Sequence, residues 1–442
     1  MQVKSLKITN VRVFERAEFE FQPGMNLLVG INGAGKSTVL DVLRTMFSQV
    51  LPDITSANRR IARPFNKDTD ISVGREFLTV DMSFHIETAL SQQHTLFEFE
   101  PIFLHHLIHL SREEFVVEES RKGEVRHQTT DLEEHNELTW VDENGLPTGE
   151  GIPVRALKHI EEQPIVVFFS AHRSVVESKK SKTGGIAAAF ADALEDRALY
   201  LNEFAQWWRA REELAKENPS LQRLLDILNE TVSRFMDGCS GLHVSDEASP
   251  TLLLQKNGAI LDARQLSDGE RSMLSLVFDL SRRLALANPQ VDDPLRSGRA
   301  VVLIDELDLH LHPSWQRTIA DRLTETFPNC QFIATTHSPQ IVGEVPPEQI
   351  ILIENGTVRR PSQSLGMDTN WILRHLMGVA ERDTETKQKL KLIEDLIEDE
   401  NYDEAIDAIA RLRDELGDFP ELVKLQTRID VIDFWDDEEN EE

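Results

Sequence analysis

The chain has 442 residues and a formal net charge of −30, with 77 acidic residues against 47 Lys and Arg. It contains no run of about 18 apolar residues that could span a membrane, and its two cysteines are too few for a disulfide framework. The acidic balance argues against a free-standing nucleic-acid-binding protein, because such proteins gain affinity by neutralising phosphates. We expect a cytoplasmic globular protein with two domains, or with one large domain that carries insertions.

A phosphate-binding motif lies near the N-terminus. Residues 30–38 read Gly-Ile-Asn-Gly-Ala-Gly-Lys-Ser-Thr and fit the pattern G-x-x-x-x-G-K-[ST], with an apolar strand before them and a helical pattern after them. In such a loop, backbone N–H groups surround the β-phosphate, the lysine adds positive charge and the serine hydroxyl binds Mg²⁺. We therefore expect ATP and Mg²⁺ as cofactors, with Ser37 as a metal ligand. The expected nucleotide contacts are Asn32, Gly33, Gly35, Lys36, Ser37 and Thr38.

The long stretch after this loop reads as strands followed by helices. Three segments have strand patterns: residues 77–85, 96–99 and 165–169. Residues 186–236 have the spacing of two or three helices. Trp207 and Trp208 in these helices could stack on nucleic-acid bases, although packing in a core is the more frequent role of such residues.

A second loop stands before a helix in the C-terminal half. Residues 266–270 read Leu-Ser-Asp-Gly-Glu, and an apolar helical stripe follows them. Ser267, with Glu270 three residues later, fits the pattern of a helix capping box. A helix N-terminus is also a natural anion site, so Ser267 and Gly269 are candidates for phosphate contact. Both roles stay open at this point.

Two adjacent carboxylates follow a buried strand. Residues 300–304 are a continuous apolar run, and Asp305 and Glu306 come directly after it. Acids at the carboxyl end of a buried parallel strand lie where such sheets bind ligands. We expect Asp305 to hold Mg²⁺ and Glu306 to orient or deprotonate the attacking water. The next strand ends at His337, which is a further candidate for the site.

The order of these motifs resembles that of the ATP-binding cassette (ABC) superfamily, in its soluble branch that contains RecF, SMC and OLD proteins. The resemblance implies an α/β fold: a P-loop mixed sheet with an antiparallel β-subdomain, a helical insert and a C-terminal all-helical extension. It also implies that two copies sandwich ATP head to tail. Ser267 and Gly269 of one copy would complete the site of the other. His337 would act as a catalytic contact to the γ-phosphate, and Asp308 would contact the other copy across the dimer.

Acidic residues concentrate at the C-terminal end, where residues 366–442 hold 24 Asp and Glu against nine Lys and Arg. This shift in composition predicts a domain boundary near residue 361. The expected segments are 1–172 as the N-terminal ATPase lobe with its β-subdomain, 173–237 as a helical insert, 238–361 as the C-terminal ATPase lobe, 362–432 as an acidic helical domain and 433–442 as a disordered acidic tail. A single helical pair cannot bury its own apolar face, so the helical domain is expected to pack on the ATPase or on a partner.

The short insert, the pattern D-E-x-D-x-H-L-H-P at 305–313 and the acidic tail together resemble the PtuA family, the ATPases of Septu anti-phage defence systems. This resemblance implies a slow, regulatory ATPase that forms a dimer or a higher even oligomer. It implies a PtuB-like HNH endonuclease as partner, contact with nucleic acid through the complex, and no nuclease domain in the chain itself. The main alternative is a RecF-like DNA-repair ATPase that acts directly on DNA. An importer subunit is disfavoured by the large insert and by the lack of a recognisable metal-binding glutamine loop.

Overall fold

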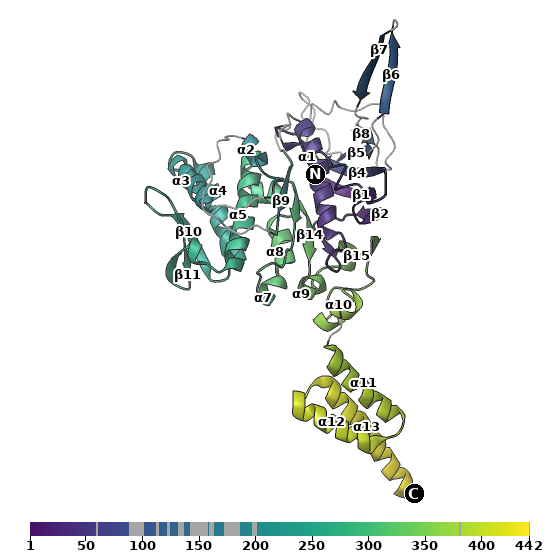
Figure 1. The fold of residues 1–442 in the computed structure, drawn as a ribbon. Helices are drawn as coiled ribbons and strands as arrows, with labels where there is room; N and C mark the ends of the chain where they lie inside the picture. Colours follow the sequence, from purple (N-terminus) through teal and green to yellow (C-terminus); the bar gives the residue numbers. More distant parts are fainter. Residues whose placement is uncertain are drawn as a thin grey trace. The chain divides into compact units, whose positions relative to one another are not determined.

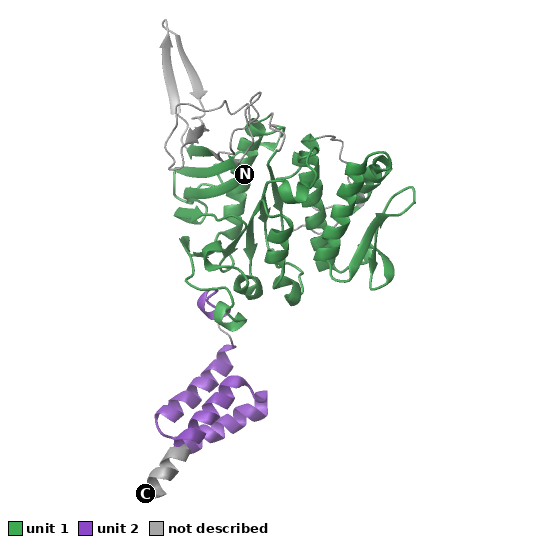
Figure 2. Ribbon diagram, turned by 180° about the vertical axis from the view of Figure 1, so that it is seen from behind, with its two compact units in different colours: residues 1–372 green, residues 373–442 purple. Residues whose placement is uncertain are grey.

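The structure is a computed structural model, and it describes residues 1–58, 61–87, 101–111, 115–121, 124–130, 137–141, 158, 163–171, 186–196, 201–379 and 382–441. The chain forms two compact units, Met1–Ile372 and Leu373–Glu442, and each is described by itself (Figure 2). In the described ranges, no helix has the length and the apolar character needed to cross a membrane. The domain limits expected from composition stay predictions.

The core of the first unit is a six-stranded mixed sheet in the order β16-β15-β3-β14-β13-β9 (Figure 1). Its strands run parallel except β16, which closes one edge in the antiparallel sense. Every residue of β3, β14, β13 and β9 is buried. β9 and β13 are unbroken apolar runs in the sequence, whereas β3 and β14 also contain buried polar residues. The strands are β3 (Met25–Val29), β9 (Ile165–Phe169), β13 (Ala300–Ile304), β14 (Cys330–Thr336), β15 (Ile350–Glu354) and β16 (Thr357–Arg359).

A second, antiparallel sheet has the order β2-β1-β4-β5-β8, which confirms the expected mixed sheet with an antiparallel β-subdomain. The buried Gln331 side chain of β14 joins the two sheets: it accepts a hydrogen bond from the Val3 N–H at 2.7 Å and donates one to the Val3 carbonyl at 2.9 Å. The strand predicted at 77–85 is β4, whereas residues 96–99 lie outside the described residues. The strands are β1 (Gln2–Val11), β2 (Phe14–Glu20), β4 (Phe77–Glu87), β5 (Pro101–Ser111) and β8 (Glu137–Val141), with a separate hairpin of β6 (Phe115–Arg121) and β7 (Glu124–Thr130).

Helices α3, α4 and α5 pack side by side in the first unit (Figure 1). The Phe278 ring of α5 contacts the rings of Phe204, Trp207 and Trp208. Trp208 is buried, so the core-packing interpretation holds for it. The helices predicted between 186 and 236 are confirmed as α2 (Ala187–Phe190), α3 (Leu201–Ala215) and α4 (Pro219–Phe235), and α5 spans Asp268–Ala287.

The segment 186–196 is held from two sides by arginines. Arg283 of α5 is fully buried, pairs with Asp279 at 2.7 Å and donates hydrogen bonds to two carbonyl oxygens of the segment at 2.6 and 3.0 Å. Arg44 of α1 (Lys36–Ile54) donates to a third carbonyl of the same segment. The segment therefore connects the helix that begins at the phosphate-binding loop with the helix that follows Ser267.

The remaining elements of the first unit are short. They are the three-stranded sheet β10 (Cys239–Val244), β11 (Leu252–Lys256) and β12 (Ala259–Asp262), the 3₁₀ turns η3 (Ala263–Gln265) and η4 (Pro347–Gln349), and the helices α6 (Pro294–Ser297), α7 (Pro313–Gln316), α8 (Ile319–Thr326), α9 (Pro339–Gly343) and α10 (Thr369–His375). Helix α10 includes residues on both sides of the boundary between the two units.

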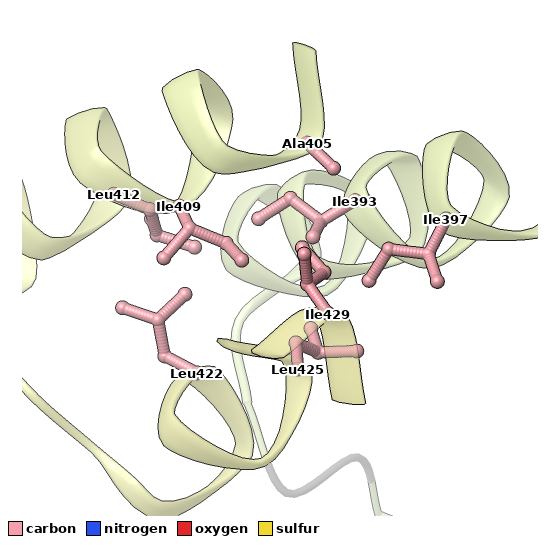
Figure 3. Close-up of a cluster of buried hydrophobic side chains, with 8 residues drawn as sticks. All are labelled: Ile393, Ile397, Ala405, Ile409, Leu412, Leu422, Leu425 and Ile429. Atoms are coloured by element: carbon pink, nitrogen blue, oxygen red, sulfur yellow. The ribbon is translucent and has the colours of Figure 1, made fainter. Parts of the chain in front are cut away.

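The second unit consists mainly of α11 (Thr384–Glu398), α12 (Tyr402–Leu416) and α13 (Pro420–Glu441). Its core is a cluster of buried residues from all three helices (Figure 3): Ile393, Ile397, Ala405, Ile409, Leu412, Leu422, Leu425 and Ile429. The apolar faces of these helices are thus covered within the unit, because α13 completes the core. The expected packing of this unit on the ATPase or on a partner stays a prediction.

Candidate functional site

The phosphate-binding loop connects β3 to α1. Its backbone takes left-handed conformations at Gly33 (φ +80°) and Gly35 (φ +107°), which glycine adopts without strain. A Cβ atom at Gly35 would come within 2.6 Å of the Phe14 ring, so a side chain there would also collide with β2. The β1–β2 hairpin therefore lies directly against the loop.

Lys36 begins α1 and is buried, with 7% of its surface exposed. Its ammonium group donates hydrogen bonds to the carbonyl oxygens of Gly30 and Ile31 at 2.8 and 3.0 Å. Burial lowers the pKa of Lys36, and nearby carboxylates, chiefly that of Asp305, only partly offset this effect. A phosphate group beside Lys36 would favour its charged form, so the loop is suited to an anionic ligand.

Ser37 and Asp305 meet across the sheet edge. The Ser37 hydroxyl donates to the two carboxylate oxygens of Asp305 at 3.1 and 3.3 Å. Hydroxyl and carboxylate oxygens are suitable ligands for Mg²⁺, which usually takes one or two protein ligands and completes its shell with water and substrate phosphates. Within the described residues, no cluster of three or more His, Cys, Asp or Glu could hold a metal by itself. The pair therefore fits a magnesium ion that arrives with a nucleotide.

Thr335, the penultimate residue of β14, connects the two adjacent carboxylate residues. Its hydroxyl donates to Asp305 at 2.7 Å and accepts a hydrogen bond from the backbone N–H of Glu306, also at 2.7 Å. Glu306 has a left-handed backbone with φ +52°, which is unusual for a residue other than glycine. Thr335 is a site residue that the sequence reasoning missed. The available signal was its position at the end of a buried strand, two residues before His337.

Asp308 is hydrogen-bonded to Thr336 and His337, the two residues that follow Thr335. Its carboxylate accepts hydrogen bonds from the Thr336 hydroxyl at 2.7 Å and from the His337 backbone N–H at 3.0 Å. In the single chain, Asp308 thus binds the backbone that carries His337. Its expected contact across a dimer stays a prediction.

Strand order explains why these groups converge. The strands that end at the loop, at His337 and at Asp305 are β3, β14 and β13, which are adjacent and parallel. Their carboxyl ends line one cavity of about 210 Å³. The lining residues are Val13, Asn32, Gly33, Gly35, Lys36, Ser37, Thr38, Asp305, Glu306, Thr335 and His337. Three residues expected from the sequence do not line it: Ser267, Gly269 and Asp308.

The loop at 266–270 forms the expected capping box on α5. The Ser267 hydroxyl accepts a hydrogen bond from the Glu270 N–H at 3.4 Å, and the Glu270 carboxylate accepts from the Ser267 N–H at 3.0 Å. Glu270 also pairs with Lys256 of β11. Ser267 is exposed to solvent and lies outside the cavity of its own chain. The capping role is confirmed, and the phosphate role would need a second chain.

Comparison with known proteins places these motifs in a family. The family model described as "AAA domain, putative AbiEii toxin, Type IV TA system" matches residues 25–343, which include the P-loop, the 266–270 loop and the Asp305 and His337 strands.

Two curated relatives and one solved structure illustrate the similarity. The retron Ec83 probable ATPase of Escherichia coli is 38% identical over 222 residues, which cover 49% of this chain and 40% of that protein. The chain therefore spans well under half of that relative. The Septu protein PtuA of Bacillus thuringiensis is 23% identical over 437 residues, 93% of each chain. Among solved structures, an Smc head bound to the C-winged helix domain of ScpA has a TM-score of 0.45 at 14% identity and covers 83% of this chain and 98% of that one.

Proposed function

The chain belongs to the ATPase family described as "AAA domain, putative AbiEii toxin, Type IV TA system", and we propose that it hydrolyses Mg²⁺-ATP in composite sites of a head-to-tail dimer. The observation that carries this proposal is that the motifs lie in two separate places in the chain. The P-loop, the two carboxylates and His337 line one cavity, whereas the Ser267 loop faces solvent outside it. A second copy is the arrangement that brings the Ser267 loop to a bound γ-phosphate.

Several cavity residues have a role in this reaction. Lys36 and the loop N–H groups bind the phosphates, and Ser37 and Asp305 hold Mg²⁺. The metal, when bound, would neutralise charge on the β- and γ-phosphates. Glu306 orients the attacking water and accepts its proton, and His337 contacts the γ-phosphate.

The similarity to Septu PtuA over 93% of the chain supports a role in defence against phages. In this role the ATPase regulates a partner nuclease of the HNH type, and nucleic acid is contacted through the complex. Co-expression with neighbouring reading frames, followed by purification, should recover an HNH protein on this chain. Metal-dependent DNA cleavage by the pure chain would contradict the assignment of cleavage to a partner.

The 38% identity to the retron Ec83 ATPase favours a second candidate, the ATPase of a retron. Purification from the native host distinguishes the two candidates, because the Septu-like candidate predicts that an HNH protein is recovered with the chain. The RecF-like alternative predicts instead that DNA alone stimulates ATP hydrolysis at about 0.15 M ionic strength, where a net charge of −30 disfavours direct DNA binding.

The Glu306→Gln variant tests the hydrolytic site. It keeps the size of the side chain and removes the charge that orients water, so we expect ATP hydrolysis to fall by about a hundredfold or more while ATP binding persists. The variant should accumulate as an ATP-bound dimer in sedimentation experiments. Glu344→Gln, an acid outside the cavity, is the control. Wild-type turnover by Glu306→Gln would show that the assignment is wrong.

Complementation tests the composite site. Ser267→Arg and Lys36→Ala should each lose hydrolysis, because one removes the loop contact and the other removes the phosphate contact. A heterodimer of the two variants retains one complete site. An equal mixture should therefore recover about a quarter of the wild-type rate if the two sites work independently. A Ser267→Arg chain that cannot bind ATP as a monomer would instead place Ser267 in the site of its own chain.

A further inference from the structure

The segment 186–196 forms hydrogen bonds with three elements that lead to the nucleotide site. The Phe168 N–H of β9 donates to the Ala193 carbonyl at 2.7 Å, and β9 pairs with β13, the strand that ends just before the two carboxylates. Arg44 donates to the segment from α1, the helix that begins at the P-loop. Arg283 donates from α5, the helix that begins with the capping box. The segment is therefore a common anchor for the elements that carry the motifs.

Arg283 lies in the C-terminal half of α5, and its side chain is 1% exposed. Its guanidinium donates to the carbonyl oxygens of Ala189 and Ala191 at 2.6 and 3.0 Å, and to the Asp279 carboxylate at 2.7 Å. Asp279 also pairs with Arg282 at 2.7 Å. A buried charge is costly unless it is paired and hydrogen-bonded. The bonds of Arg283 therefore hold the C-terminal half of α5 against the segment.

Arg44 holds α1 in a corresponding way. It is 6% exposed and donates to the Leu194 carbonyl of the same segment. Its guanidinium lies over the Phe168 ring of β9, 4.5 Å from the ring centroid, and pairs with Asp41 at 3.5 Å. Lys36 lies at the start of the same helix. Arg44 therefore holds the P-loop helix against both the sheet and the segment.

The direction of α5 determines where the Ser267 loop points. Ser267 caps the first turn of α5, and the backbone of Gly269 lies so close to the His310 carbonyl that a Cβ atom there would come within 2.2 Å of its oxygen. This contact holds the N-terminal end of α5, while Arg283 holds the C-terminal half. Without Arg283, the helix can tilt about its N-terminal contact. Hydrogen bonds weaken steeply when their angle bends, so a tilt would weaken the contact of the loop with a phosphate.

We propose that Arg283 is a positioning residue that acts in trans: through α5 it orients the Ser267 loop toward the ATP bound to a second copy of this chain. Arg44 acts in cis, because α1 carries the P-loop of its own chain. The two arginines bind the same segment but serve opposite halves of the composite site. This role rests on the composite site proposed above.

Complementation between full-length chains tests the role of Arg283. Arg283→Met keeps an apolar side chain and removes the guanidinium, so we expect unchanged ATP affinity and ATP hydrolysis that is about tenfold slower or less. An equal mixture with Lys36→Ala should recover as much hydrolysis as the reference mixture of Ser267→Arg with Lys36→Ala, because the mixed dimer has one complete site. A mixture with Ser267→Arg should recover none, because neither chain then supplies an oriented Ser267 loop.

Arg44→Met should give the opposite pattern. Its Ser267 loop is intact but its P-loop helix is not held, so hydrolysis should recover in a mixture with Ser267→Arg and not in a mixture with Lys36→Ala. A general loss of stability would lower the rate in both mixtures alike. The dependence on the partner variant therefore separates positioning from a merely structural role.

Arg282→Met is the matched control. It removes the neighbouring arginine, which pairs with Asp279 but forms no hydrogen bond with the segment 186–196 in the part of the chain that the structure describes. Its rate of ATP hydrolysis should stay close to wild type. Arg283→Lys keeps the charge and N–H donors and should restore part of the rate. If Arg283→Met does not fold, Arg283→Lys takes its place in the same mixtures.

The proposal is overturned if Arg283→Met hydrolyses ATP at the wild-type rate, or if its mixtures with Lys36→Ala and with Ser267→Arg recover equally or not at all. The reference mixture separates the two levels of failure. If it recovers no hydrolysis, the composite site is wrong and the role of Arg283 falls with it. If it recovers hydrolysis while the Arg283→Met mixtures do not differ, only the role of Arg283 is wrong.

Discussion

At the scale of single residues, the Thr335 hydroxyl lies between Asp305 and Glu306, the two carboxylate residues of the proposed hydrolytic site. It donates to one oxygen of Asp305 and accepts from the N–H of Glu306, which has a left-handed backbone and lines the cavity. Mutation of a residue that hydrogen-bonds to a metal ligand typically lowers metal affinity or activity by about 10–100-fold. We therefore propose Thr335 as a positioning residue for both carboxylates.

Replacing Thr335 by Val preserves the shape of the side chain and removes both hydrogen bonds. We expect the Mg²⁺ concentration that supports half-maximal ATP hydrolysis to rise about tenfold or more. Thr335→Ser keeps the hydroxyl and should remain close to wild type. A Mg²⁺ titration of the hydrolysis rate measures the effect. Equal Mg²⁺ dependence of the Val and Ser variants would rule out this role.

At the scale of elements, the first turn of α5 packs against the loop that follows β13. A Cβ atom at Gly269 would collide with the carbonyl oxygen of His310, which itself has a left-handed backbone with φ +61°. The close approach places the Ser267 loop and the Asp308 loop in contact within one chain. His312, two residues after His310, caps α7 by accepting a hydrogen bond from the Ser314 N–H.

Gly269→Ala should force these two elements apart. We expect a loss of stability of about 1–3 kcal/mol from overpacking and a fall in ATP hydrolysis, while ATP still binds at the P-loop. Denaturant unfolding and nucleotide titration measure the two effects. Asp268→Ala, at an exposed neighbouring position, is the matched control. If the Gly269→Ala chain has wild-type stability, the close approach between Gly269 and the His310 carbonyl is not required.

At the scale of the whole molecule, the chain consists of an ATPase unit and a small helical unit with separate cores. The second unit has its own buried cluster, and its helices are joined by exposed ion pairs such as Lys389 with Glu415. A core of this size stabilises a unit by only a few kcal/mol, about 3–5 at most. The second unit should therefore unfold before the first.

Ile409→Ala tests this independence. Ile409 is fully buried in the core of the second unit, and its truncation should cost about 2–5 kcal/mol, enough to unfold that unit. We expect protease cleavage between residues 373 and 442 and an unchanged rate of basal ATP hydrolysis. Ile406→Ala, on the exposed face of the same helix, should resist cleavage. Loss of ATP hydrolysis in Ile409→Ala would show that the first unit needs the second.

The sequence by itself determined the local chemistry. A strand buried on both faces is mostly apolar, so β9 and β13 were visible as continuous apolar runs and β3 as a run that only Asn26 interrupts. The groups that follow these strands were visible as candidate ligands. The capping box at Ser267 was equally local, because its partners are three residues apart.

Only the tertiary structure decided which of these groups meet. Strand order inserts β14 between the P-loop strand and the Asp305 strand, and this brings Thr335 to both carboxylates from 30 residues away in the sequence. It also leaves Ser267 outside the cavity and brings Arg44 and Arg283 to the same segment. Such contacts depend on side chains that reach from one element to another. The periodicity of a sequence predicts single helices and strands but not these contacts.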